Sequence, residues 1–205
     1  PVIILTSSSD EETKLEALEL GASEFLAKPV DPSELALRLR NTLATKAYQD
    51  HLTYFDGLTG LPNRRLFVER TDRALERAAS RSMECAVLHI DIDRFSQVND
   101  ALGHRVGDAV LKSVAERLEK SVRVSDLLGS WSTHAEGSPL SRIGGDAFLL
   151  FLAEISSIDR AALIARRVLS EISEPFRLDG RDLFLTPSIG IALFPGDGTN
   201  AETLA

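Results

Sequence analysis

Short apolar runs and helix-forming segments alternate over the first quarter of the chain. Residues 2–5 and 24–27 are short, mostly apolar runs, which are typical of strands buried in a parallel sheet. Residues 10–20 and 31–51 have helical patterns, and Gly21 ends the first of them. The order strand, helix, strand, helix predicts half of a doubly wound α/β sheet, which is too small to fold alone.

After residue 55 the pattern changes between helix and strand several times. The segment 56–65 is dense in turn residues and marks a domain boundary. The expected elements are helices at 63–79, 94–101, 105–122 and 157–173, a strand at 86–90, a hairpin at 141–152, and strands at 175–178 and 182–194. This order predicts an α+β sheet with helices packed on it.

Three acidic residues stand where strands are expected to end. Gly144-Gly145 between two extended segments predicts a tight hairpin that carries Asp146 at its tip. Asp91 and Asp93 end a buried strand, with Ile92 between them on the opposite side. Carboxylates on adjacent strand ends and the Ile92 carbonyl could bind Mg²⁺ or Mn²⁺ for phosphoryl transfer. The alternative is that Asp91 and Asp93 cap the helix that begins near residue 94.

A second pair of polar residues flanks Gly103-His104. Asn99 precedes this turn and Asp108 follows it. If both side chains face one pocket, the Asp108 carboxylate could accept hydrogen bonds from guanine N1 and N2, while the Asn99 amide pairs with O6 or N3. The alternative is that both residues cap helices.

Composition limits the classes of function. The net charge of −8 argues against non-specific binding to nucleic acid, although not against a nucleotide whose phosphates a metal neutralises. No apolar run is long enough to span a membrane, and the single cysteine, Cys85, favours a reducing cytoplasm. The chain begins inside an apolar run without methionine and stops inside a helical pattern, so we expect a longer protein in both directions.

Five motifs occur in a fixed order, at 56–65, 90–95, 99–108, 142–148 and 188–192. In sequence and spacing they resemble the GGDEF family, the diguanylate cyclase domains, over about residues 53–205. The segments 174–178 and 194–198 are similar to GGDEF domains that precede an EAL phosphodiesterase domain. The resemblance implies a palm-like α+β fold and a homodimer that joins two GTP molecules into cyclic di-GMP.

The resemblance also implies roles for individual residues. By this resemblance, a metal would be bound by Asp91, the Ile92 carbonyl and the catalytic Asp146. Guanine would be recognised by Asn99 and Asp108, with further GTP contacts from Arg94 and Phe95. A product-inhibition site would lie at Arg123 and Asp126. For the last pair, the alternative is an arginine at a helix end and an aspartate in a loop. The segment 127–143 is also longer than the family's usual spacing, so an insertion would lie beside that site.

The first part of the chain resembles the second half of a response-regulator receiver domain. Thr6 would be its switch hydroxyl, and Lys28, before a cis-proline, would contact the phosphoryl group. The aspartate that accepts the phosphoryl group from a histidine kinase would precede Pro1. We therefore expect a partial receiver at 1–45, a helical linker at 46–55 and a C-terminally truncated GGDEF domain at 56–205. The helix at 32–51 could pack on its own sheet or pair with a second copy.

Two positions depart from the family pattern. Ala147 stands where the signature usually has glutamate, and Ser96 stands where a lysine usually follows the phenylalanine. Three hypotheses remain: a degenerate GGDEF module that binds GTP or cyclic di-GMP and regulates a neighbour such as an EAL domain, an active diguanylate cyclase, and a protein-interaction domain that binds no nucleotide.

Overall fold

The computed structural model describes residues 1–7, 11–122, 138–178 and 180–205. The chain divides into two compact units, residues 1–53 and 54–205, and each is described by itself. Among the described residues, every helix is too short or too polar to cross a membrane.

The first unit has the predicted order of elements. Strands β1 (Ile3–Thr6) and β2 (Glu24–Ala27) pair in parallel, and they are joined by α1 (Glu11–Glu19). Helix α2 (Pro32–Tyr54) follows, and the Asp31 side chain accepts hydrogen bonds from the first-turn N–H groups of Ser33 and Glu34. A helix begins here because this cap satisfies donors that have no intrahelical partner.

Helix α2 contacts β2 near its start. Leu35 is half-buried and Arg38 forms an ion pair with Glu24 on β2. All 23 residues of α2 are described and none is buried; Leu39 and Leu43 are 42% and 57% exposed. These two leucines therefore lie on the surface of this unit.

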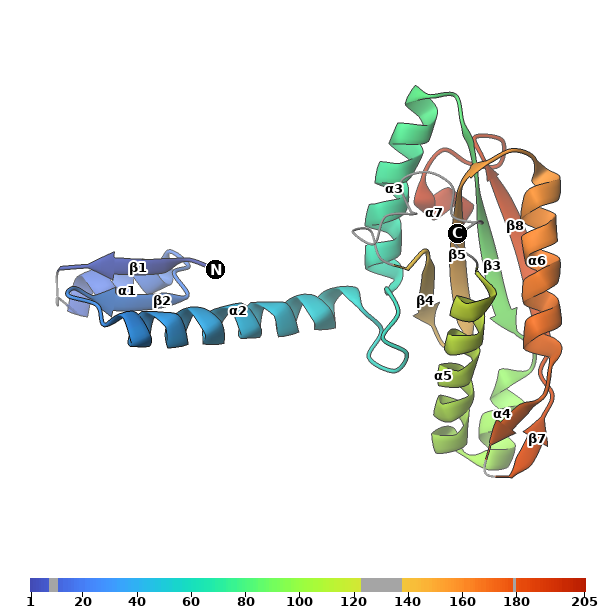
Figure 1. The fold of residues 1–205 in the computed structure, drawn as a ribbon, viewed down its shortest axis with the longest axis horizontal. Coiled ribbons are helices and arrows are strands. Elements are labelled where there is room, and N and C mark those ends of the chain that lie inside the picture. Colours follow the sequence, from blue (N-terminus) through green and yellow to red (C-terminus); the bar gives the residue numbers. More distant parts are fainter. Residues whose placement is uncertain (8–10, 123–137, 179) are drawn as a thin grey trace. The chain divides into compact units, whose positions relative to one another are not determined.

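The second unit is built on a four-stranded antiparallel sheet in the order β4-β5-β3-β8 (Figure 1). Its strands are β3 (Glu84–Ile92), β4 (Leu140–Gly144), β5 (Ala147–Ile155) and β8 (Pro187–Phe194). Its helices are α3 (Arg64–Ser80), α4 (Phe95–Leu102), α5 (His104–Ser121), α6 (Ile158–Ser173) and α7 (Ala201–Leu204).

Alternating residues of the central strand β3 enter two cores. Ala86, Leu88 and Ile90 pack in the larger core with residues of α5 and α6, while Cys85 and Val87 pack with residues of α3. The sheet is thus covered on both faces, which explains why consecutive residues of this strand are apolar. Near the C-terminal end of β3, Asp91 is only half-buried, whereas its neighbour Ile92 remains in the larger core.

One predicted strand, at 182–194, is two strands. A short hairpin of β6 (Phe176–Leu178) and β7 (Arg181–Leu183) forms its own two-stranded sheet, and β8 begins only at Pro187. The division follows from pairing, because Pro187 lies opposite Ile92, the last residue of β3. Residues before Pro187 have no partner on the central strand and leave the sheet.

The guanidinium of Arg117 on α5 binds the C-terminal end of α6. It donates hydrogen bonds to the carbonyl oxygens of Glu171, Glu174 and Pro175, and it lies 3.6 Å from the ring centroid of Phe176. The last carbonyls of a helix have no intrahelical donor, so this side chain satisfies groups that would otherwise need water.

Replacing Arg117 by alanine should therefore lower the free energy of unfolding by about 2 kcal/mol, since charged hydrogen bonds and a cation–π contact are lost together. Arg117→Lys should recover only part of this, because an ammonium cannot bind several carbonyls in the plane of a guanidinium. Urea denaturation of the three proteins measures both differences. Equal stability of wild type and Arg117→Ala would show that the contact is not energetically important.

Candidate functional site

The predicted hairpin is present and lies beside the end of β3. Its tip is Gly145-Asp146, and Gly144 and Gly145 have φ angles of 136° and 55°, which a side chain would strain. Asp91 pairs with Ala147 on β5, the residue after Asp146, so the two aspartates meet at one edge of the sheet. Asp146 is half-buried at this tip.

Asp91 and Asp146 repel each other. Burial raises the pKa of Asp91, and the negative charges of Asp146 and Asp93 raise it further, while His89 acts in the opposite direction. A carboxylate whose ionised form is disfavoured by a neighbouring carboxylate is stabilised when a cation binds between the two. A pair of neighbouring carboxylates of this kind is compatible with a bound cation.

Asp93 has a different environment. Its two carboxylate oxygens accept hydrogen bonds from the hydroxyls of Ser188 and Thr186, at 2.6 and 2.7 Å, and its N–H donates to the Thr186 carbonyl at 2.8 Å. The two hydroxyls lower the pKa of Asp93. These hydrogen bonds of Asp93 connect the end of β3 with the start of β8.

The capping alternative does not describe these residues. The N-cap position of α4 is Arg94, and no side chain among the described residues caps this helix. Asp93 binds the hydroxyls of Ser188 and Thr186 instead, and within the described part of the chain this helix has no hydrogen bond from a capping side chain.

The donor set fits a hard cation that binds together with a phosphate ligand. Asp91, Asp146 and the Ile92 carbonyl offer oxygen atoms only, and Mg²⁺ is commonly held by one or two carboxylates, water and substrate phosphates. Mn²⁺ accepts the same ligands. Among the described residues there is no group of three or more His, Cys, Asp or Glu side chains placed to hold a metal. Ala147, beside Asp146, adds no donor.

An ion pair that the sequence analysis missed fixes the turn. One guanidinium nitrogen of Arg142 lies 2.9 Å from both carboxylate oxygens of Asp56, and two others donate to the Gly145 carbonyl at 3.0 and 2.6 Å. Both side chains are largely buried, 10% and 19% exposed. Arg142 therefore connects the loop before α3 with the residue that precedes Asp146.

Asp56 is held as an anion. Burial acts to raise its pKa, but hydrogen bonds from Thr59 and Arg142 outweigh this and the pKa is lowered. The sequence offered one signal for this ion pair: an acidic residue begins the motif 56–65 and a basic residue begins the motif 142–148. Nothing in the spacing indicated that these two side chains meet.

Asn99 and Asp108 lie on two consecutive helices. Asn99 is half-buried within α4, and Asp108 is exposed within α5. Gly103, with a φ of 82°, ends one helix and begins the next, so neither polar side chain caps a helix. Both residues thus lie on the two helices that meet at this junction, and their shared pocket stays a prediction.

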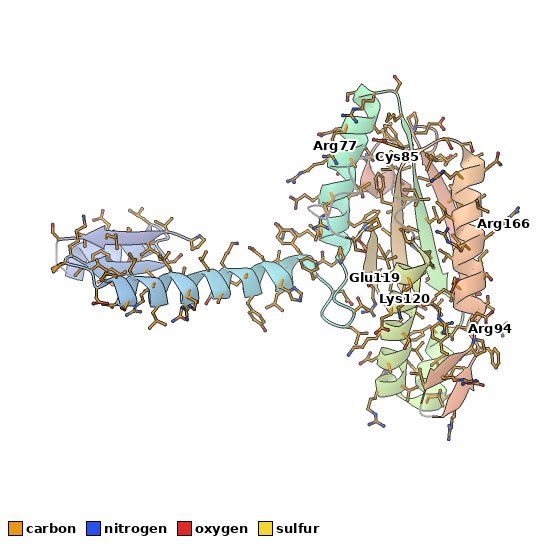
Figure 2. The ribbon with its side chains drawn as sticks, viewed as in Figure 1. Arg77, Cys85, Arg94, Glu119, Lys120 and Arg166 are labelled. Atoms are coloured by element: carbon orange, nitrogen blue, oxygen red, sulfur yellow. The ribbon has the colours of Figure 1, made fainter. Side chains whose placement is uncertain are left out.

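Arg94 and Phe95 lie at the start of α4. Arg94 is exposed, has a φ of 56°, and lies at the end of the unit that also carries α4 and β7 (Figure 2). The side chain of Phe95 is 7% exposed and packs in the larger core, so only its backbone could contact a nucleotide. First-turn N–H groups of a helix are suitable phosphate donors.

The remaining predicted sites are the receiver switch and the product-inhibition site. Thr6 and Lys28 lie at adjacent ends of β1 and β2, where the Lys28 N–H donates to the Thr6 carbonyl, and the predicted cis bond before Pro29 is present. Arg123, Asp126 and most of the predicted insertion lie outside the described residues.

Comparisons with known proteins agree with this arrangement. The family model described as "Diguanylate cyclase, GGDEF domain" matches residues 53–205. The response regulator PleD of Caulobacter vibrioides is 33% identical over the whole chain, which spans 45% of PleD. The bifunctional diguanylate cyclase/cyclic di-GMP phosphodiesterase MucR of Pseudomonas aeruginosa is 38% identical over 75% of the chain, which spans 20% of MucR.

A solved structure shows the same fold. The GGDEF domain of TpbB from Pseudomonas aeruginosa superposes with a TM-score of 0.65 and 39% identity, over 74% of this chain and 81% of that one. The chain spans less than half the length of PleD and MucR. With the family model matching residues 53–205 and the acidic strand end in place, the chain belongs to the GGDEF family of diguanylate cyclase domains.

Proposed function

We propose that residues 54–205 are a GGDEF domain that binds GTP with Mg²⁺ and has weak or no cyclase activity, acting as a regulatory module in cyclic di-GMP signalling. The observation that carries this proposal is that Asp91 and Asp146 meet at one edge of the sheet, next to an alanine at the fourth signature position.

Each residue has a defined task in this proposal. Asp91, Asp146 and the Ile92 carbonyl hold the metal, which supplies positive charge to the triphosphate. Asn99 and Asp108 bind guanine, and the first turn of α4 faces phosphate. The methyl group of Ala147 can neither bind a metal nor accept a proton from an attacking 3′-hydroxyl. The domain therefore still binds GTP, but it forms little or no cyclic di-GMP.

We extend the proposal to the parts outside the domain. The match to PleD, named a response regulator, runs through residues 1–53 and supports a receiver domain there, with Thr6 and Lys28 in the switch and a histidine kinase as partner. The exposed leucines of α2 would pair in a homodimer. MucR, which is named for both activities, supports control of an EAL domain. Such a protein would act in the cytoplasm.

An active diguanylate cyclase is the second candidate. It is favoured by the intact pair of carboxylates, because Asp91 and Asp146 could hold a catalytic metal without a third ligand. Accumulation of cyclic di-GMP by the full-length protein incubated with GTP and Mg²⁺ separates the two candidates, since a degenerate module would produce little or none.

Restoring the missing carboxylate should increase turnover. Ala147→Glu should raise the rate of cyclic di-GMP formation by about 100-fold, as expected when a phosphoryl-transfer site regains a ligand. Ala147→Gln is the matched control, because it has nearly the same size but no charge, and it should leave the rate unchanged. The rates are measured by chromatography of the product. No gain in Ala147→Glu would mean that Ser96 or another departure limits the reaction.

A further inference from the structure

A glycine in α5 lies directly against the side chain of Asn99. Gly107 is buried, and a Cβ atom built on it would lie 1.9 Å from Asn99 Oδ1, 3.0 Å from Asn99 Cγ and 3.2 Å from Phe95 Cζ. The shortest of these distances is far below any van der Waals contact. The Asn99 carboxamide therefore fills the space that a side chain at position 107 would need.

This glycine is not required by backbone conformation. Gly107 lies inside α5 and is not among the glycines with positive φ, in contrast to Gly103. A glycine in a helix interior costs about 1 kcal/mol relative to alanine. The room that it leaves for Asn99 is the structural reason for its presence.

The same backbone turn holds both residues. The Gly103 N–H donates to the Asn99 carbonyl at 2.8 Å, and the Gly107 N–H donates to the Gly103 carbonyl at 3.2 Å. Asn99 and Gly107 are thus each bonded to Gly103, one on either side of the junction between α4 and α5. Their contact is set by this short connection and by the buried ring of Phe95 beneath it.

We propose that Gly107 is a positioning residue for recognition of the nucleotide base. Its missing side chain lets the Asn99 carboxamide lie between the two helices in a restricted orientation, and Asp108 is the next residue along α5. A recognition group that is already ordered loses less entropy when the base binds. This inference rests on the proposed GTP binding and adds to it the residue that orders the amide.

The affinity for GTP tests this role. Titration calorimetry with GTP and Mg²⁺ should show at least tenfold weaker binding by Gly107→Ala than by wild type. In the Asn99→Ala background the same substitution should change the affinity less than twofold, because it acts only through the amide. Gly57→Ala is the matched control, since a Cβ there meets no atom within 4 Å, and it should bind GTP like wild type.

Thermal unfolding gives a test that does not depend on GTP. Gly107→Ala should lower Tm in the wild-type background, and it should leave Tm unchanged or higher when Asn99 is already alanine. Wild-type affinity in Gly107→Ala, or an equal loss of affinity with and without Asn99, would overturn the inference. If the wild-type protein does not bind GTP at all, the proposed function fails. The dependence of the Gly107→Ala change in Tm on Asn99 would still show whether these two residues are in contact.

Discussion

Replacing Arg142 by alanine is expected to lower the free energy of unfolding by about 3 kcal/mol and to weaken Mg²⁺-dependent GTP binding as well. The substitution leaves the largely buried carboxylate of Asp56 without its partner and removes two hydrogen bonds from the Gly145 carbonyl. Because Gly145 precedes Asp146, the turn that bears the metal ligand loses its support. Chemical denaturation and calorimetry measure the two effects.

A double-mutant cycle with Asp56→Asn isolates the ion pair. The loss in the double mutant should be smaller than the sum of the two single losses, because the second substitution removes the unpaired charge. The contribution of Asp56 should be present above its unfolded-state pKa of about 3.9 and lost as the pH falls through its lowered folded-state pKa. Strictly additive losses would mean that the pair is not coupled.

Asp91→Asn should have opposite effects on stability and on function. The pKa of Asp91 is raised by burial and by the neighbouring carboxylates, so its ionised form destabilises the metal-free fold at neutral pH. Asparagine removes this repulsion, and we expect a higher Tm without Mg²⁺. The same change removes a metal ligand, so Mg²⁺-dependent GTP binding should fall at least about 100-fold, which is more than 2 kcal/mol.

One control variant accompanies this prediction. Ser188→Ala removes a hydroxyl that binds Asp93 but no proposed metal ligand, and its GTP affinity should fall much less. A lower Tm in Asp91→Asn, together with unchanged GTP affinity, would show that Asp91 is a structural residue. A carboxylate with a purely structural role would not raise Tm and weaken GTP binding together when it is replaced by asparagine.

The central strand and the hairpin could be predicted because their signals are local. Residues 86–90 alternate between two apolar cores, and Gly144-Gly145 interrupts two extended segments where positive φ angles are needed. The meeting of Asp91 and Asp146 follows from these two elements once they pair. The helical junction around Gly103 is equally local.

The supporting contacts could not be predicted because they join distant parts of the chain. Arg142 and Asp56 are 86 residues apart, and Asp93 is 95 residues from Ser188. Whether Phe95 faces solvent or the core also depends on how α4 packs on the sheet, and its burial removes the side chain from the expected GTP contacts. Tertiary packing decides such details, and a single sequence does not contain a periodic signal for them.

The most direct test of the proposed function is titration of the full-length wild-type protein with GTP, once in Mg²⁺ and once in excess EDTA. The carboxylate pair at the end of β3 predicts binding in Mg²⁺ and at least tenfold weaker binding in EDTA, because Asp91 and Asp146 would then face the triphosphate without a cation between them. No binding in either buffer, or equal affinity in both, would contradict the assignment of this edge of the sheet as a metal-dependent nucleotide site.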